Sequence, residues 1–140
     1  MRNHYNDILM DYKKSLQKLE EGIQDLDKMN NTVPIIVEGE KDVDALNALG
    51  IHGKIISLNA GLSISNLCDT IARRWDEIII LTDWDRKGGR LCKRIIENLK
   101  GRTRCNTDFR KIFAKNAMVK DMEGLPSYID TLKKNNCHPA

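Results

Sequence analysis

Three acidic residues of this chain stand directly after two short apolar runs, where an α/β protein would place its chemistry. Glu38 follows the run at residues 33–37, and Asp83 and Asp85 follow the run at 78–81. Ligands of open α/β sheets bind beyond the carboxyl ends of the strands. If the chain stays extended past the second run, Asp83 and Asp85 point to the same side of it. If the two strands are neighbours, the three carboxylates converge on one crevice.

Carboxylates that crowd into one crevice repel one another unless some are protonated or a cation lies among them. Oxygen ligands without Cys or His favour a hard cation, Mg²⁺ or Mn²⁺. Two such ions, roughly 3.5–4 Å apart, would clamp the oxygens of a phosphodiester in line. Asp42, four residues after Glu38, falls in the first turn of the next expected helix, where its charge also suits the helix dipole.

Each of these residues also has an ordinary structural role. Asp85 is well suited to cap the helix that begins at Arg86, and Asp42 is a common kind of first-turn acid. Gly39 and Gly88 are typical turn residues. A single D-x-D motif is therefore a weak signal. A glutamate and a D-x-D motif, each at the exit of its own strand, are much less easily accidental, so we interpret the set as functional.

The elements that must position these acids alternate along the chain. Short apolar runs rich in β-branched residues predict strands at 33–37, 54–58 and 77–81. Apolar positions three and four apart predict helices at 42–49, 63–74 and 87–99. Weaker patterns predict a strand near Thr103, a helix from Asp108, a strand near Met118 and Val119, and a last helix at 127–134. Strands separated by helices imply right-handed crossovers and a mainly parallel sheet flanked by helices.

A further helix is predicted at residues 5–29. Its apolar positions form a narrow seam of the coiled-coil type: Leu9, Tyr12, Leu16, Leu19, Ile23 and Leu26. One helix of this length is marginal as a free coiled coil, so packing on the domain's own sheet is favoured. The alternative is a contact with a second copy of the chain or with a protein partner.

The acidic motifs resemble those of the Toprim domain, which topoisomerases, bacterial-type primases and ribosomal-RNA-maturing ribonucleases share. The resemblance rests on two motifs, Val37-Glu38-Gly39-x-x-Asp42 and, some 40 residues later, Asp83-x-Asp85-x-x-Gly88. Gly61 fits the glycine that this fold places between them. The similarity covers about residues 33–122, and the chain is similar to small, stand-alone Toprim proteins of archaea.

The resemblance implies a Toprim-like, Rossmann-like α/β domain at 33–122. An added N-terminal helix at 1–32 would pack on this domain, and a C-terminal helix and tail would occupy 123–140. It implies that Glu38, Asp83 and Asp85 are catalytic and bind Mg²⁺. Two ions are expected, with Mn²⁺ as a substitute and Asp42 as a supporting ligand. The partner that the resemblance implies is RNA or DNA.

The basic residues gather in one part of the chain. Residues 86–115 contain eleven Lys and Arg against two acids, which leaves +9 in this segment and −6 in the remainder of a chain whose net charge is +3. A basic stripe beside an acidic metal site suits a polyanion whose backbone must reach the metal. The expected phosphate contacts are Lys41, Arg86, Lys87, Arg90 and Arg94. The alternative is a solvated helix face without a partner.

Hydrolysis is the reaction that such a site supports most simply, because it needs only metal, an activated water and a bound strand. We therefore predict a Mg²⁺-dependent nuclease. Primase-type nucleotidyl transfer is less favoured, since 140 residues leave little room for a nucleotide site and a template module. Strand passage is not expected, because it needs a tyrosine on another domain. The alternative from a different class is a non-catalytic nucleic-acid-binding or assembly subunit.

Composition excludes several other classes. With 41% hydrophobic and 31% charged residues, the chain has the composition of a folded globular domain. No apolar run approaches the roughly 20 residues of a membrane-spanning helix. The N-terminus is polar, unlike a signal peptide. The four cysteines contain no close pair of the kind that zinc sites use. These features predict a cytoplasmic protein with free thiols.

Overall fold

The computed structural model describes residues 4–58, 61 and 63–136 of the chain. Helices and short strands alternate along it in the order α1 (His4–Asn30), β1 (Ile35–Val37), α2 (Glu40–Ala48), β2 (Ile55–Ser57), α3 (Ile64–Arg74), β3 (Glu77–Ile80), α4 (Arg86–Leu99), β4 (Arg104–Asn106), α5 (Asp108–Asn116) and α6 (Leu125–Asn136). This is the predicted α/β class.

The strands form one parallel sheet in the order β2-β1-β3-β4. Ile35 pairs with both Ile55 and Ile79, so β1 lies between β2 and β3. The strands that end near Val37 and Leu81 are therefore parallel neighbours, which is the condition under which the acids were expected to converge. From β1 the chain continues to β2 at one edge of the sheet, and from β3 it continues to β4 at the opposite edge. The strand order therefore reverses between β1 and β3, and open α/β sheets bind ligands at such a point.

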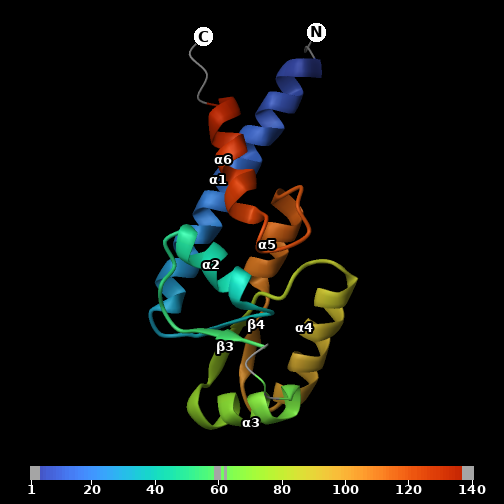
Figure 1. Ribbon diagram of the computed structural model, residues 1–140. Helices are drawn as coiled ribbons and strands as arrows, with labels where there is room; N and C mark the ends of the chain where they lie inside the picture. Colours follow the sequence, from blue (N-terminus) through green and yellow to red (C-terminus); the bar gives the residue numbers. More distant parts are fainter. Residues whose placement is uncertain (1–3, 59–60, 62, 137–140) are drawn as a thin grey trace.

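Helices cover both faces of the sheet, because successive side chains of a strand point to opposite sides (Figure 1). Ile36, Ile78 and Ile80 pack with the apolar faces of α3 and α4. Ile35 and Ile79 pack with α1, α2, α5 and α6 on the other face. All five isoleucines are fully buried. Strands buried on both faces explain the continuous apolar runs in the sequence.

The N-terminal helix packs within the chain. It contacts α5 and α6, and in Figure 1 it runs beside α6, away from the sheet. Leu19 and Leu26 are fully buried, and Tyr12, Leu16 and Ile23 pack against the same core. The side chain of Leu9 lies outside the described residues. The seam is thus buried within the chain, mainly against α5 and α6, whereas the sequence favoured packing on the sheet.

The strand predicted near Met118 and Val119 is wrong. Residues 117–124 form bends and a turn between α5 and α6. The segment lies beside the loop after β3, where the structure describes no strand that could pair with it: the Trp84 indole N–H donates to Val119 O, and the Trp84 backbone N–H donates to Lys120 O at 3.1 Å. The last helix also begins earlier than predicted, at Leu125, with Pro126 in its first turn, where proline is tolerated.

Two smaller observations concern the excluded classes. Among the helices that the structure describes, none is both long and apolar enough to cross a membrane. The three described cysteines, Cys68, Cys92 and Cys105, carry free thiols, and burial raises the pKa of each. Cys137 lies outside the described residues.

Candidate metal and nucleic-acid site

The exits of β1 and β3 are joined by a glutamate. Glu38 Oε2 accepts the backbone N–H of Asp83 at 2.7 Å, although the two residues are 45 positions apart. The pairing of β1 with β3 brings them together, because both follow strands that end at the same edge of the sheet. Glu38 and Asp83 are thus the two predicted site residues that the structure places in direct contact.

The Asp83 side chain is held on two sides. Its Oδ1 accepts the backbone N–H of Met122 at 3.0 Å. Burial, more than any other cause, raises the pKa of Asp83, to about 6, and the neighbouring carboxylates of Glu38 and Asp121 act in the same direction. The Met122 hydrogen bond opposes this shift. A carboxyl group that titrates near neutral pH beside a second carboxylate is typical of a functional site.

Asp42 lies close to this pair but is engaged in its own helix. It is 7% exposed, and its Oδ2 accepts the backbone N–H of Gly39 at 3.1 Å, which is one half of a capping box at the start of α2, since the N-cap Gly39 has no side chain to supply the other half. Burial and the charge of Asp83 raise the pKa of Asp42. The first-turn role considered from the sequence is therefore observed. Asp42 also adds negative charge beside Asp83.

Asp85 caps α4. Its Oδ1 accepts the Gly88 N–H at 2.7 Å, and Thr82 Oγ1 donates to the Gly88 carbonyl at 2.8 Å. A Cβ on Gly88 would overlap the Asp83 carbonyl oxygen, so this turn of the helix requires glycine. The structural role weighed for Asp85 is thus realised, and Asp85 does not join Glu38 and Asp83 in one cluster. In the described part of the chain, no group of three or more His, Cys, Asp or Glu is arranged to hold a metal ion.

The Glu38–Asp83 pair nevertheless fits a magnesium ion. Mg²⁺ dehydrates reluctantly and is commonly bound through one or two carboxylates, with water and substrate phosphate completing its octahedron. The Glu38 carboxylate accepts the Asp83 backbone N–H, and its charge helps to raise the pKa of the Asp83 carboxyl group, so a cation placed between the two side chains would relieve repulsion. The donors present suit an ion held by few protein ligands and do not suit an all-protein cage.

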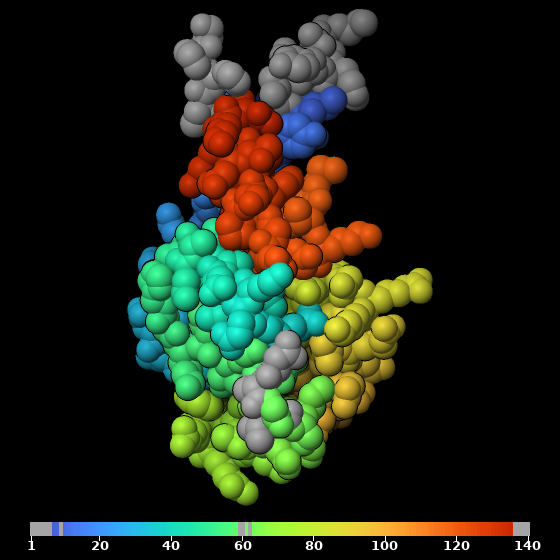
Figure 2. Space-filling view, in the orientation of Figure 1, coloured from blue at the N-terminus to red at the C-terminus, as the bar shows by residue number. Residues whose placement is uncertain are grey.

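A hollow of about 230 Å³ opens beside Glu38. Its lining combines Glu38 and Lys87 with the apolar side chains of Leu58, Ile64 and Leu91. In Figure 2 the first turns of α4 (yellow) lie beside the start of α2 (cyan) on the face shown. A lysine on α4 therefore lines the same hollow as the glutamate at the exit of β1, which brings a cationic side chain close to Glu38.

The other predicted phosphate contacts are on the surface. Arg86, Arg90 and Arg94 are exposed on α4 and pair with no acid among the described residues. Lys41 on α2 lies 4.0 Å from Glu123, and both side chains are well exposed. Three other arginines of the basic segment have internal partners: Arg102, Arg104 and Arg110. Some basic residues of the segment are therefore exposed without an acidic partner, and others bond to groups of the same chain.

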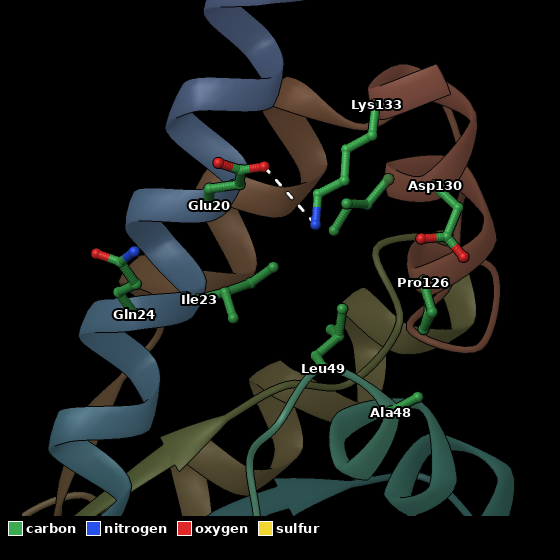
Figure 3. A pocket seen from close by; sticks show the side chains of 9 residues that line it. Glu20, Ile23, Gln24, Ala48, Leu49, Pro126, Asp130 and Lys133 are labelled. Atoms are coloured by element: carbon green, nitrogen blue, oxygen red, sulfur yellow. Dashed lines mark ion pairs between the residues drawn. The ribbon is translucent and has the colours of Figure 1, made fainter. Parts of the chain in front are cut away.

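A second hollow lies away from the acidic edge. It measures about 410 Å³ and is bounded by α1, α2 and α6, with the Glu20–Lys133 ion pair at one side (Figure 3). Ile23, Leu49 and Pro126 supply apolar walls. None of the predicted site residues lines it, so this hollow is separate from the site described above.

The sequence did not single out two parts of the site. Arg110 on α5 donates to the carbonyl oxygens of Thr82 and Asp83, at 3.0 and 2.7 Å. The segment 117–124 holds the same loop through Trp84 and Met122. The only signal in the sequence was the place of Arg110 within the basic segment 86–115.

Residues 33–116 match the Toprim domain, over more than half of the chain. With the parallel sheet and the acids at the exits of β1 and β3, this shows that the chain belongs to the Toprim domain family. The resemblance inferred from the two acidic motifs is confirmed. Membership implies a metal-dependent role connected with nucleic acids, since Toprim domains generally bind divalent metals.

Within that family the chain is similar to small archaeal proteins named UPF0292. It is 41% identical to one of Methanocaldococcus jannaschii over 118 residues, which cover 81% of this chain and 91% of the relative. It is 35% identical to one of Methanosarcina barkeri over 128 residues, 87% of each chain. A solved structure of a protein from Aquifex aeolicus matches with a TM-score of 0.65 and 27% identity, over 74% of this chain and 94% of that one.

Proposed function

We propose that this chain is a Mg²⁺-dependent nuclease that hydrolyses phosphodiester bonds of RNA or DNA. The observation that carries the proposal is the contact between Glu38 and Asp83 at the β1–β3 boundary, next to a hollow that Lys87 also lines. Glu38 and Asp83 would hold the ion, and Mn²⁺ would substitute for Mg²⁺. Asp85 would hold a second ion through the oxygen that it does not use for capping, with Asp42 in a supporting role.

The chemistry divides between the metal and the chain. When bound, the metal would supply an activated water and would stabilise negative charge on the phosphate. Glu38 is the residue that we assign to proton transfer, because its carboxylate borders the hollow where a scissile phosphate would lie. Asp83, which titrates near neutral pH, would be ionised by a neighbouring cation, and its carboxylate is oriented by the Met122 N–H.

The basic row on α4 would bind the phosphate backbone. Arg86, Arg90 and Arg94 recur every four residues, so they lie along one side of the helix at about 6 Å intervals. Lys87 would connect this row to the acidic pair, and Lys41 would contact phosphate from α2. Such contacts carry no sequence information, so we expect binding that depends on salt more than on base sequence.

A second candidate is a nucleic-acid-binding or assembly subunit without catalysis. The observation that favours it is the use of Asp85 as a helix cap, which leaves two acids rather than three in contact. Primase-type nucleotidyl transfer ranks below both. Turnover distinguishes the nuclease from the binding subunit. A nuclease needs a divalent ion to cleave, whereas a binding subunit only loses affinity as the salt concentration rises.

The proposal is tested by incubating labelled RNA and DNA, single- and double-stranded, with Mg²⁺, Mn²⁺ or EDTA. We expect cleavage with either ion and none with EDTA. Glu38→Gln should abolish cleavage while binding stays similar, because the substitution keeps the shape and removes the charge. Asp44→Asn, an exposed acid on α2, is the matched control and should cleave at the wild-type rate. Binding by the wild-type protein without cleavage under any ion would favour the second candidate.

We also propose that residues 33–122 carry the site, that 1–32 and 123–140 are additions to it, and that the protein acts in the cytoplasm. A homodimer or a partner contact through α1 would cover Ile8 and Met10, whose side chains are exposed. Sedimentation of the wild-type protein and of Met10→Lys tests this contact. A monomer at all concentrations would exclude the homodimer.

A further inference from the structure

One arginine of the basic segment faces inward, toward the back of the acidic site. The guanidinium of Arg110 donates from Nε to the Thr82 carbonyl at 3.0 Å and from Nη2 to the Asp83 carbonyl at 2.7 Å. Both contacts are partly buried. A Cβ on Gly89 would lie 3.7 Å from Nη2, so the guanidinium sits between the loop after β3 and the first turns of α4.

The position of Arg110 follows from where the sheet ends. The ladder between β3 and β4 runs only to the pair Ile79–Asn106, and the chain then turns into α5. The carbonyls of Thr82 and Asp83 therefore have no strand beside them. Buried carbonyls without a donor are costly. Arg110, from the first turn of α5, provides the donors that a longer β4 would have supplied.

We propose that Arg110 is a positioning residue of the acidic site and not a contact for nucleic-acid phosphate. It fixes the backbone of residues 82–83 from behind, so that the Asp83 N–H meets Glu38 and the Asp83 carboxylate meets the Met122 N–H. The planar fork of arginine can serve two carbonyls at once, which a lysine ammonium cannot do in the same fixed geometry. The proposal deepens the proposed function and rests on it for any effect on turnover.

The position of the guanidinium sets Arg110 apart from the other basic residues. Arg86, Arg90 and Arg94 are exposed, whereas Arg110 is partly buried and its donors are directed at main-chain carbonyls. Arg102 is the natural comparison. Its guanidinium also bonds a main-chain carbonyl, that of Asn98, and pairs with Asp69 at 2.8 Å, but at a place that none of the site residues touches.

The test compares Arg110→Lys and Arg110→Ala with the matched controls Arg102→Lys and Arg102→Ala. The first readout is the exchange rate of the Asp83 amide proton, measured by NMR in EDTA without nucleic acid. We expect at least a tenfold faster exchange in the Arg110 variants and no change in the Arg102 variants. This readout needs neither metal nor turnover, so it remains informative if the nuclease proposal fails.

The second readout is Mg²⁺ affinity, followed by Trp84 fluorescence in a Trp75→Phe background. Loss of a residue that orients a metal ligand typically lowers affinity about 10- to 100-fold. We expect a loss in that range for Arg110→Ala and a smaller one for Arg110→Lys. Guanidinium chloride at tens of millimolar should restore part of the loss in Arg110→Ala, whereas an equal concentration of KCl should not.

The third readout separates positioning from phosphate binding. In EDTA, the nucleic-acid affinity of the Arg110 variants and its dependence on salt should equal those of the wild-type protein. If cleavage is observed, kcat should fall while KM stays constant. A salt slope reduced by about one, with unchanged Mg²⁺ affinity, would make Arg110 a phosphate contact and overturn the proposal. Unchanged Asp83 exchange in folded Arg110→Lys would overturn it as well.

Discussion

At each end of the sheet, one side chain joins neighbouring elements through hydrogen bonds to the main chain, but the two side chains differ in chemistry. At the amino end, the buried Asn30 amide donates from Nδ2 to the carbonyls of Val33 and Lys54, at 3.0 Å each, and joins α1 to the entries of β1 and β2. At the carboxyl end, Glu38 accepts the Asp83 N–H and joins the exits of β1 and β3. A neutral amide serves the first junction and a carboxylate serves the second.

This difference separates a neutral junction from one that lies beside carboxyl groups with raised pKa values. An amide does not titrate, so the hydrogen bonds of Asn30 should contribute the same stability at every pH. At the carboxyl end, burial raises the pKa of both Asp83 and Asp42, which means that the fold holds their charged forms at a cost. Carboxyl groups that are kept charged at a cost in stability usually belong to a ligand-binding site.

The largest effect is expected at the carboxyl end, from Gly88→Ala. The added methyl would overlap the Asp83 carbonyl, which is backbone and cannot yield without moving the site. We expect a loss of about 3 kcal/mol in the free energy of unfolding, measured by urea denaturation. Gly89→Ala is the control: its methyl would make ordinary contacts, so it should be neutral or stabilising by up to about 1 kcal/mol. Equal stabilities of the two variants would contradict this account.

At the amino end, Asn30→Ala should cost about 2 kcal/mol, because two carbonyls lose their donor. The loss is moderated because Asn30 Oδ1 is buried without a hydrogen-bond partner among the described residues, and the substitution removes it. The cost should be the same at pH 5 and pH 7.5, with Mg²⁺ affinity unchanged. Asn98→Ala, which removes an exposed bond to the Arg94 carbonyl, should cost much less. A strong pH dependence in Asn30→Ala would break the contrast between the two ends.

The smallest expected effect is a gain in the free energy of unfolding, in the variant Asp83→Asn. The folded pKa of Asp83, about 6, is above its ordinary value of 3.8, so its stabilising contribution is present below pH 3.8 and is lost as pH rises through 6. Without metal, Asp83→Asn should therefore be more stable than wild type at pH 7.5, by about 1 kcal/mol once solvent screening of this partly exposed group is allowed for.

Urea denaturation in EDTA between pH 4 and 7.5 measures this difference. Asp83→Asn should flatten the fall in stability across that range, with a residual slope of the same sign from Asp42. Saturating Mg²⁺ should reverse the ranking, because it stabilises the protein that binds it. A variant that is less stable than wild type in EDTA at pH 7.5 would show that Asp83 is structural and not held at a cost.

The elements around the site were predictable where their signals are local. Ser63 caps α3 by accepting the Asn66 N–H at 3.1 Å, as its position before an apolar run suggests. Gly50 ends the turn after α2 with φ of +89°, a conformation that favours glycine. Apolar β-branched runs identified β1 and β3, and helices between them required a parallel sheet. Whether Glu38 and Asp83 meet depended on the order of the strands, which the structure supplies.

The strand predicted at residues 118–119 failed because a local pattern had a distant competitor. Met118 and Val119 have strand propensity, but the carbonyls of Val119 and Lys120 are taken by Trp84, and no strand lies beside them. Asp85 has a local partner: the Gly88 N–H, three residues away, binds one of its oxygens, which is the capping role weighed from the sequence. For residues 118–119 the sequence permits two arrangements, and the hydrogen bonds available after packing select one.

By itself, the sequence determined that acids stand at the exits of two buried strands, because alternation and helix periodicity act over a few residues. Only the tertiary structure decided which acids meet and what holds them. Asp83 is held by Glu38, Arg110 and Met122, which lie 45, 27 and 39 positions away. Contacts across such separations depend on how β1, α5 and the segment 117–124 pack around β3, and no local period in the sequence encodes that packing.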